Sequence, residues 1–138
     1  MKLLLLLLSI PSAVVPILGL VWLLWWLDRY DREPVWLFGG AFLWGAIGGV
    51  VLAVVGSTLI ALPLSWFVGS DTLQSLASVL IAPLIEEPSK ALVLFAIASS
   101  RHFDNTTDGF VYGAAAGLGF GMTENFLYFA GSAMEGSV

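Results

Sequence analysis

Long apolar stretches, each at least as long as a membrane-crossing helix, make up most of this sequence, and most charged residues lie in the short connections between them. A segment inside a bilayer must pair its own backbone N–H and C=O groups, so such stretches fold as helices. The composition agrees, since 59% of residues are hydrophobic and 11% are charged, whereas soluble domains carry about 25% charged residues. The sequence therefore predicts an all-α, polytopic membrane helix bundle, a single transmembrane domain over residues 1–138.

Apolar spans can be drawn between the charged connections, and we expect about four transmembrane helices. They cover about residues 3–27, 35–64, 73–98 and 109–131. A cleaved signal peptide is a weaker interpretation of the first span, because this apolar stretch is longer than a signal core of about 7–15 residues. Arg29, Arg32 and Arg101 lie in the first and third connections, so the positive-inside rule predicts an N-terminus outside the cell.

Two adjacent acids, Glu86 and Glu87, lie inside the third expected span, where a lipid-facing helix carries no charge. Intramembrane acids usually face a bundle interior or a wet cavity, so they are candidates for a functional site. Neighbouring carboxyl groups in a partly dry site resist joint ionisation, and one that accepts a proton can activate a water molecule for hydrolysis. The simpler alternative is a structural ion pair with Lys90, although one carboxylate would be enough to neutralise one lysine.

A second polar cluster, Glu124 and Asn125, lies in the fourth expected span, and we predict that both clusters form one site. The carboxylates of Glu86, Glu87 and Glu124 are candidates for holding a divalent metal whose bound water would be the nucleophile. A stripe of small residues on the fourth span is predicted to pack closely against the helix of the glutamates. The stripe consists of Gly109, Gly113, Gly117 and Gly121.

The connection before the fourth span contains His102, Asp104, Asn105 and Asp108. We interpret it as a solvated loop with helix-capping acids rather than a metal site. The chain has no cysteine, which excludes disulfides and thiolate metal sites. Its net charge of −5 argues against a nucleic-acid partner and leaves the lipid bilayer as the expected surroundings. Two other classes stay open, a proton-coupled membrane carrier and a non-catalytic membrane module.

Several motifs, taken in order, resemble the PrsW family of intramembrane proteases, which is related to the CAAX prenyl proteases. They are Tyr30-Asp31-Arg32-Glu33-Pro34, Ala41-Phe42-Leu43-Trp44-Gly45-Ala46, Glu86-Glu87-Pro88-Ser89-Lys90, Phe103-Asp104-Asn105, Asp108-Gly109-Phe110-Val111-Tyr112-Gly113, Gly117-Leu118-Gly119-Phe120 and Glu124-Asn125. The resemblance covers most of the chain, from about Leu27 to Tyr128. Each motif alone is weak, but their ordered combination is specific.

The resemblance implies a bacterial cell-membrane enzyme, classed as a metallopeptidase with zinc as the expected metal. Its substrate would be a membrane-anchored regulatory protein such as an anti-sigma factor. By motif, Glu86 and Glu87 would activate water or associate with the metal, while Lys90 would tune them. Glu124 and Asn125 would complete the site, and Asp104 and Asp108 would support it from the acidic connection.

The family pattern continues into further helices that carry a histidine, and this chain ends at Val138. The chain is therefore expected to be the N-terminal part of a longer protease domain. The alternative is a short relative that keeps the fold without catalysis.

Overall fold

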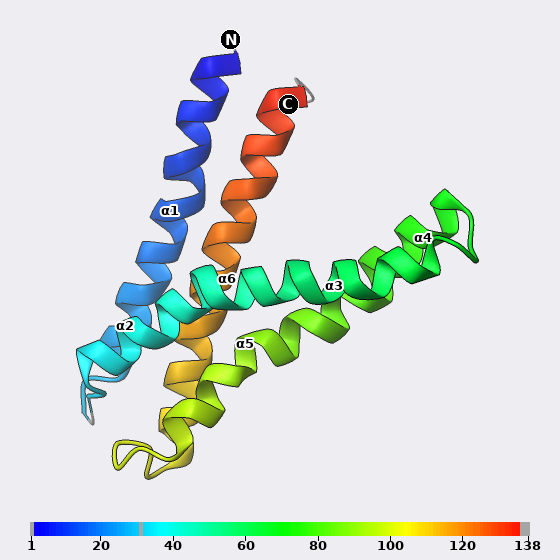
Figure 1. The fold of residues 1–138 in the computed structure, drawn as a ribbon. Coiled ribbons are helices and arrows are strands. Elements are labelled where there is room, and N and C mark those ends of the chain that lie inside the picture. The colour runs from blue at the N-terminus through cyan, green and yellow to red at the C-terminus, as the bar shows by residue number, and fades with distance from the viewer. Residues whose placement is uncertain (1, 31, 136–138) are drawn as a thin grey trace.

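The computed structural model describes residues 2–30 and 32–135, so Asp31 of the first motif lies outside the described residues. Every secondary-structure element in this part of the chain is helical, which confirms the all-α prediction. The helices are α1 (Lys2–Leu27), α2 (Val35–Leu43), η1 (Trp44–Gly49), α3 (Val50–Leu64), α4 (Ser70–Leu76), η2 (Ala77–Ile81), α5 (Ala82–Ala98) and α6 (Thr106–Glu135). Because η1 and η2 are π-helical turns, α2–η1–α3 and α4–η2–α5 each continue as one rod (Figure 1).

The rods form two antiparallel pairs (Figure 1). Helices α1 and α6 lie side by side, with both chain ends at the same end of the pair. Helix α3 pairs with α5, and this second pair diverges from the first. The pairs meet where α2 and η1 contact α6, so the α2–η1 segment joins the two halves of the molecule.

The buried core lies at this junction. Its members come from the end of α1, from α2, from the second half of α5 and from the first half of α6. They are Leu24, Leu37, Phe38, Ala41, Val93, Ile97, Val111, Tyr112, Ala115 and Ala116. Trp25 adds an edge-to-face contact with Phe38, with ring centroids 5.7 Å apart. Burial of these apolar side chains holds α6 against α1, α2 and α5.

The closest helix contact is made by glycines other than those of the predicted stripe. A Cβ atom on Gly119 would lie 2.0 Å from the Phe42 carbonyl oxygen, and one on Gly45 would lie 1.8 Å from the Ala116 carbonyl oxygen. Backbone therefore touches backbone where α6 crosses the α2–η1 segment.

Only part of the predicted glycine stripe packs closely against other residues. A Cβ on Gly113 would lie 3.7 Å from Leu94 of α5, as the prediction requires, whereas one on Gly109 would meet Phe103 of the preceding connection at 3.3 Å. Gly117 and Gly121 have nothing within 4 Å of such an atom. The α5 rod diverges from α6 along its length, so one face of α6 cannot follow α5 through all its turns.

The π-helical turn η2 ends just before Pro83. Proline has no N–H, and its ring clashes with the carbonyl one turn earlier, so a wider turn at this place relieves the clash. The other π-helical turn, η1, contains Gly45, Gly48 and Gly49 and contacts α6. Both turns lie in the rods that carry or border the polar clusters.

By length and composition, two helices of the described chain are apolar enough to cross a membrane, Leu7–Leu27 and Val35–Leu64. The second has the bounds expected from the sequence, and the first lies within its expected span. The α4–α5 rod and α6 carry the polar clusters, and spans at 73–98 and 109–131 stay predictions.

Candidate active site

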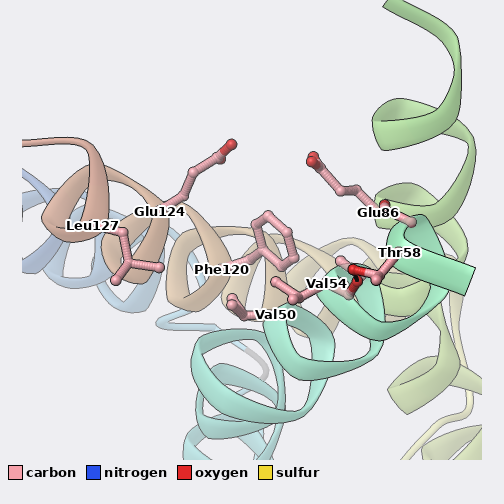
Figure 2. Close-up of a pocket in the computed structure, with 9 residues that line it drawn as sticks. Val50, Val54, Thr58, Glu86, Phe120, Glu124 and Leu127 are labelled. Carbon is pink, nitrogen blue, oxygen red and sulfur yellow. Dashed lines mark hydrogen bonds between the residues drawn. The ribbon is translucent and has the colours of Figure 1, made fainter. Parts of the chain in front are cut away.

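A cavity of about 340 Å³ lies between α3, α5 and α6, and the carboxyl groups of Glu86 and Glu124 both border it. The α3 wall is one helix face, formed by Val50, Ala53, Val54, Ser57 and Thr58. Phe120 and Leu127 of α6 complete the apolar lining. Figure 2 shows the two carboxyl groups pointing toward each other from α5 and α6. The structure thus brings together one acid from each predicted polar cluster.

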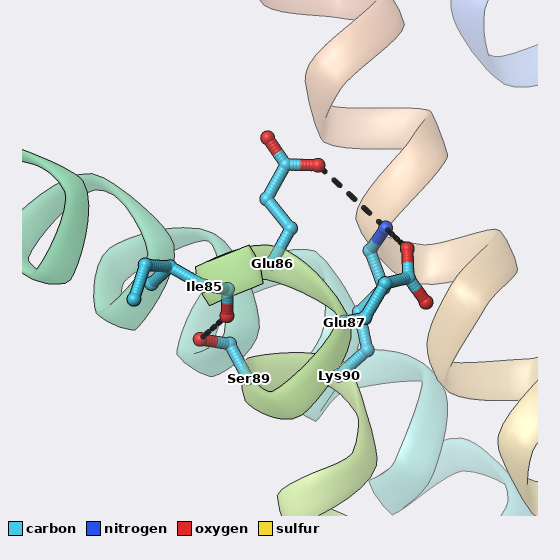
Figure 3. Close-up of polar contacts among 5 residues, drawn as sticks. All are labelled: Ile85, Glu86, Glu87, Ser89 and Lys90. Carbon is cyan, nitrogen blue, oxygen red and sulfur yellow. Dashed lines mark hydrogen bonds and ion pairs between the residues drawn. The ribbon is translucent and has the colours of Figure 1, made fainter. Parts of the chain in front are cut away.

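Glu87 points away from this cavity. Adjacent residues on an α-helix are rotated by about 100° and do not share a face. Glu87 is 73% exposed and its Oε1 lies 2.8 Å from Lys90 Nζ, while the less exposed Glu86 lies 3.8 Å from the same nitrogen (Figure 3). The adjacent glutamates therefore share Lys90, but Glu86 borders the cavity whereas Glu87 is largely exposed and lies closer to the lysine.

Lys90 connects this part of α5 to α6. Its Nζ lies 4.2 Å from the centroid of the Phe120 ring, in cation–π geometry, besides its ion pairs with the two glutamates. Such a contact contributes about 0.5–2 kcal/mol. Since Phe120 lines the cavity, the lysine fixes both a wall of the cavity and the carboxylate beside it.

The π-helical turn η1 is hydrogen-bonded to both helices that carry the facing acids. The indole Nε1 of Trp44 donates to the Ser89 carbonyl oxygen of α5 at 2.9 Å, and Thr123 Oγ1 of α6 donates to the Ala46 carbonyl oxygen at 2.8 Å. Ser89 is buried, and its hydroxyl donates to the Ile85 carbonyl oxygen at 2.7 Å (Figure 3). Sequence reasoning missed these positioning contacts, because hydrogen bonds across helices leave no periodic signal.

Replacing Trp44 with phenylalanine is expected to lower the free energy of unfolding by about 1 kcal/mol or more, since one hydrogen bond is lost and a smaller aromatic ring replaces the indole. The matched control is Trp66→Phe, because Trp66 is 83% exposed. Denaturant titration of the protein in detergent micelles measures both changes. Equal effects of the two substitutions would show that the bond to Ser89 contributes nothing to stability.

The remaining predicted site residues lie away from the cavity. Asn125 is exposed and does not border it. Asp104 and Asp108 precede Glu124 by about four or more helical turns. Asn105 Oδ1 accepts the N–H groups of Thr107 and Asp108, while Asp108 Oδ2 accepts that of Asn105, which makes a capping box. The capping expected of this connection is confirmed, but the connection is not solvated throughout, because Asp108 is 3% exposed. His102 contacts Ser100 and Trp36 there.

A complete metal-binding set is not assembled by the described residues. In this part of the chain, no three His, Cys, Asp or Glu side chains lie close enough to hold one ion together. Glu86, Glu87 and Glu124 fail to form such a set because Glu87 turns toward Lys90. The cavity offers two carboxyl groups, and these can accept and donate protons or hydrogen-bond a peptide group.

The chain matches known proteins of one family. The sequence model of a family described as PrsW family intramembrane metalloprotease matches residues 33–138. A Clostridioides difficile protein named Protease PrsW is 37% identical over 118 residues, which are 84% of this chain and 48% of that protein. A Bacillus subtilis protein of the same name is 30% identical over 127 residues, which are 91% of this chain and 56% of that protein. This chain therefore spans about half the length of the curated relatives it matches, and no solved structure matches it.

Proposed function

Because this chain belongs to the PrsW family of intramembrane metalloproteases, we propose that it supplies catalytic carboxyl groups to a peptidase of membrane-anchored proteins. The observation that carries the proposal is the facing pair Glu86 and Glu124 in one cavity between α3, α5 and α6. Acids within membrane helices are rare and usually functional, and the convergence of these two from different helices favours a shared chemical role.

In this proposal, Glu86 accepts a proton from a water molecule as that water attacks the scissile carbonyl carbon. The proton then passes to the departing amine nitrogen. Glu124 hydrogen-bonds the substrate's peptide group from the opposite wall, and the apolar side chains of Phe120 and Leu127 limit access of bulk water. Lys90 acts as a positioning residue through Glu86 and Phe120.

We propose a membrane-anchored regulatory protein, such as an anti-sigma factor, as the substrate and the bacterial cell membrane as the location. Support comes from the family resemblance and from the bacterial relatives named Protease PrsW. A divalent metal, with zinc as the family's expected ion, stays a proposal for the whole protein. Glu86 and Glu124 are the described residues whose carboxylates border the reaction space.

The test is cleavage of a single-span reporter protein by the full-length protein in reconstituted vesicles. Glu124→Gln is expected to slow cleavage by about tenfold to a hundredfold, because a charged hydrogen-bond partner of the substrate is replaced by a neutral one. The control is Tyr128→Phe, about one turn further along α6, whose side chain is 74% exposed and lies outside the cavity. Membrane insertion of both variants is checked by flotation of the vesicles.

The other function classes give different results in the same vesicles. A proton-coupled carrier predicts proton flux driven by a pH gradient, abolished by Glu124→Gln, with no cleavage of the reporter. A non-catalytic module predicts neither flux nor cleavage in the wild-type protein. Either result would overturn the peptidase proposal.

A further inference from the structure

A second group of acidic side chains is buried about four turns before Glu124 on α6, away from the cavity. Glu33, in the connection between α1 and α2, is 7% exposed, and Asp108, in the first turn of α6, is 3% exposed. Tyr112, one turn further along α6, is fully buried. Buried acids are costly unless they are neutral or hydrogen-bonded, so their partners determine what they do.

These side chains connect separate parts of the chain through hydrogen bonds. The Tyr112 hydroxyl donates to Glu33 Oε2. The Asp108 carboxyl group is near enough to raise the pKa of Glu33, both as a side-chain hydrogen-bond partner and through its charge. The Glu33 backbone N–H donates to Asp28 Oδ2 at 3.1 Å, just beyond the end of α1. Asp108 Oδ2 accepts the Asp104 N–H at 2.7 Å and the Asn105 N–H at 3.0 Å. The cluster thus joins the α1–α2 connection to the first turns of α6.

A hydrogen bond between two carboxyl groups needs one proton, because an ionised carboxylate can only accept. Burial opposes ionisation of Asp108, but the amides of Asn105 and Asp104 outweigh it and hold the pKa of Asp108 below its ordinary value. Burial raises the pKa of Glu33 to about 7, against the lowering effect of the Tyr112 hydroxyl and with a further rise from Asp108. The proton of the pair therefore belongs to Glu33.

The surrounding groups do not neutralise this pair. Asp28 adds a negative charge on the side of α1, and α2 carries no titratable side chain. Arg29 stacks on the rings of Trp26 and Tyr30, and Arg32 lies over Trp25. On the α5–α6 side, His102 contacts Trp36 and Asp104 is hydrogen-bonded to Asn105. Among the described residues, the ion pairs are those of Lys90, so an ionised Glu33 would face Asp108 without a cation between them.

We propose that Glu33 is a pH-sensitive latch whose proton fastens the α1–α2 connection to the first turn of α6. Loss of this proton replaces the hydrogen bond between Glu33 and Asp108 with repulsion between two buried carboxylates, and the connection is released. The proposal is independent of the peptidase assignment, because Glu33, Asp108 and Tyr112 do not line the cavity, whose first α6 residue, Phe120, lies about two turns beyond Tyr112.

The direction of the pH effect follows from linkage. Glu33 binds its proton more tightly in the folded protein, where its pKa is about 7, than at its ordinary value of 4.5. Its stabilising effect is therefore complete below about pH 4.5 and is lost as the pH rises to about 7 and beyond. Between pH 6 and pH 8, these values predict that the equilibrium between released and fastened states rises about tenfold.

The test uses the absence of native cysteine in this sequence. Single cysteines are placed at Val111, which is 3% exposed beside the latch, and at Thr107, which is exposed on the same helix. The maleimide labelling rate of the Val111→Cys protein, divided by that of the Thr107→Cys protein, is measured at pH 6 and pH 8. We expect this ratio to rise about tenfold in the native background. With Glu33→Gln it stays low at both pH values, because the amide donates to Asp108 without titrating.

A ratio with the same pH dependence in the native and Glu33→Gln backgrounds would overturn the proposal. So would a high ratio at pH 6 with Glu33→Gln, because the amide would then fail to replace the proton-bearing carboxyl group. The melting temperature of the cysteine-free protein between pH 5 and pH 9 is a second readout that needs no buried cysteine. Its fall with pH should disappear in Glu33→Gln and persist in Asp71→Asn, an exposed acid on α4.

Discussion

Replacing Gly119 with alanine is expected to lower the free energy of unfolding by about 3 kcal/mol or more, the upper end of overpacking effects. The added Cβ would lie 2.0 Å from the Phe42 carbonyl oxygen and 2.9 Å from the Ala46 nitrogen. Both are backbone atoms, so no side-chain rotation relieves the clash. Helix α6 must separate from the α2–η1 segment, and the hydrogen bond from Thr123 to the Ala46 carbonyl oxygen is lost with the contact.

The matched controls lie on the same helix. Gly117→Ala and Gly121→Ala place a methyl group where nothing lies within 4 Å. They are expected to be neutral or stabilising by up to about 1 kcal/mol, since alanine favours a helix over glycine. Tryptophan fluorescence during denaturant titration in detergent micelles measures all three variants. Equal stability of the Gly119 and Gly117 variants would mean that α6 does not cross the α2–η1 segment as closely as described.

This contrast shows what the sequence could predict about packing. The four-residue spacing of Gly109, Gly113, Gly117 and Gly121 correctly places them on one helix face. The spacing cannot show which helix packs against that face. Gly119 lies outside the stripe, and its importance depends on the direction in which the α2–η1 segment crosses α6. That direction is set by contacts between residues distant in the sequence.

The candidate site was predictable to a similar degree. Acids inside apolar spans are rare, so Glu86 and Glu124 stand out in the sequence and prove to face one cavity. Glu87 stands out equally but faces Lys90, which the rotation between adjacent helical residues could have indicated. Glu33 belongs to a motif of the family resemblance, but nothing in the sequence indicates its burial, because it lies among charged residues in a connection. Its burial arises from the packing of that connection against α6.

Replacing Glu86 with glutamine is expected to slow reporter cleavage by about a hundredfold to ten-thousandfold, the usual contribution of a general base. Glutamine keeps the size of the side chain but cannot accept a proton from the attacking water. Glu87→Gln should slow cleavage by less than about fivefold, because it removes a largely exposed ion pair worth about 0–1 kcal/mol. Cleavage rates in reconstituted vesicles, normalised to inserted protein, measure both.

The comparison of these adjacent positions is the sharpest test of the site geometry. Both substitutions remove one negative charge from the same helix turn, so a general electrostatic effect would act on both alike. Glu86 borders the cavity, whereas Glu87 is 73% exposed beside Lys90. A much larger loss of cleavage with Glu86→Gln than with Glu87→Gln would therefore indicate that Glu86 touches the substrate's reacting atoms. Equal losses at both positions would mean that the glutamates act through their shared charge or as a coupled pair, and would contradict the separate role of Glu86. A large loss confined to Glu87→Gln would reverse their roles and require α5 to rotate about its axis during the reaction.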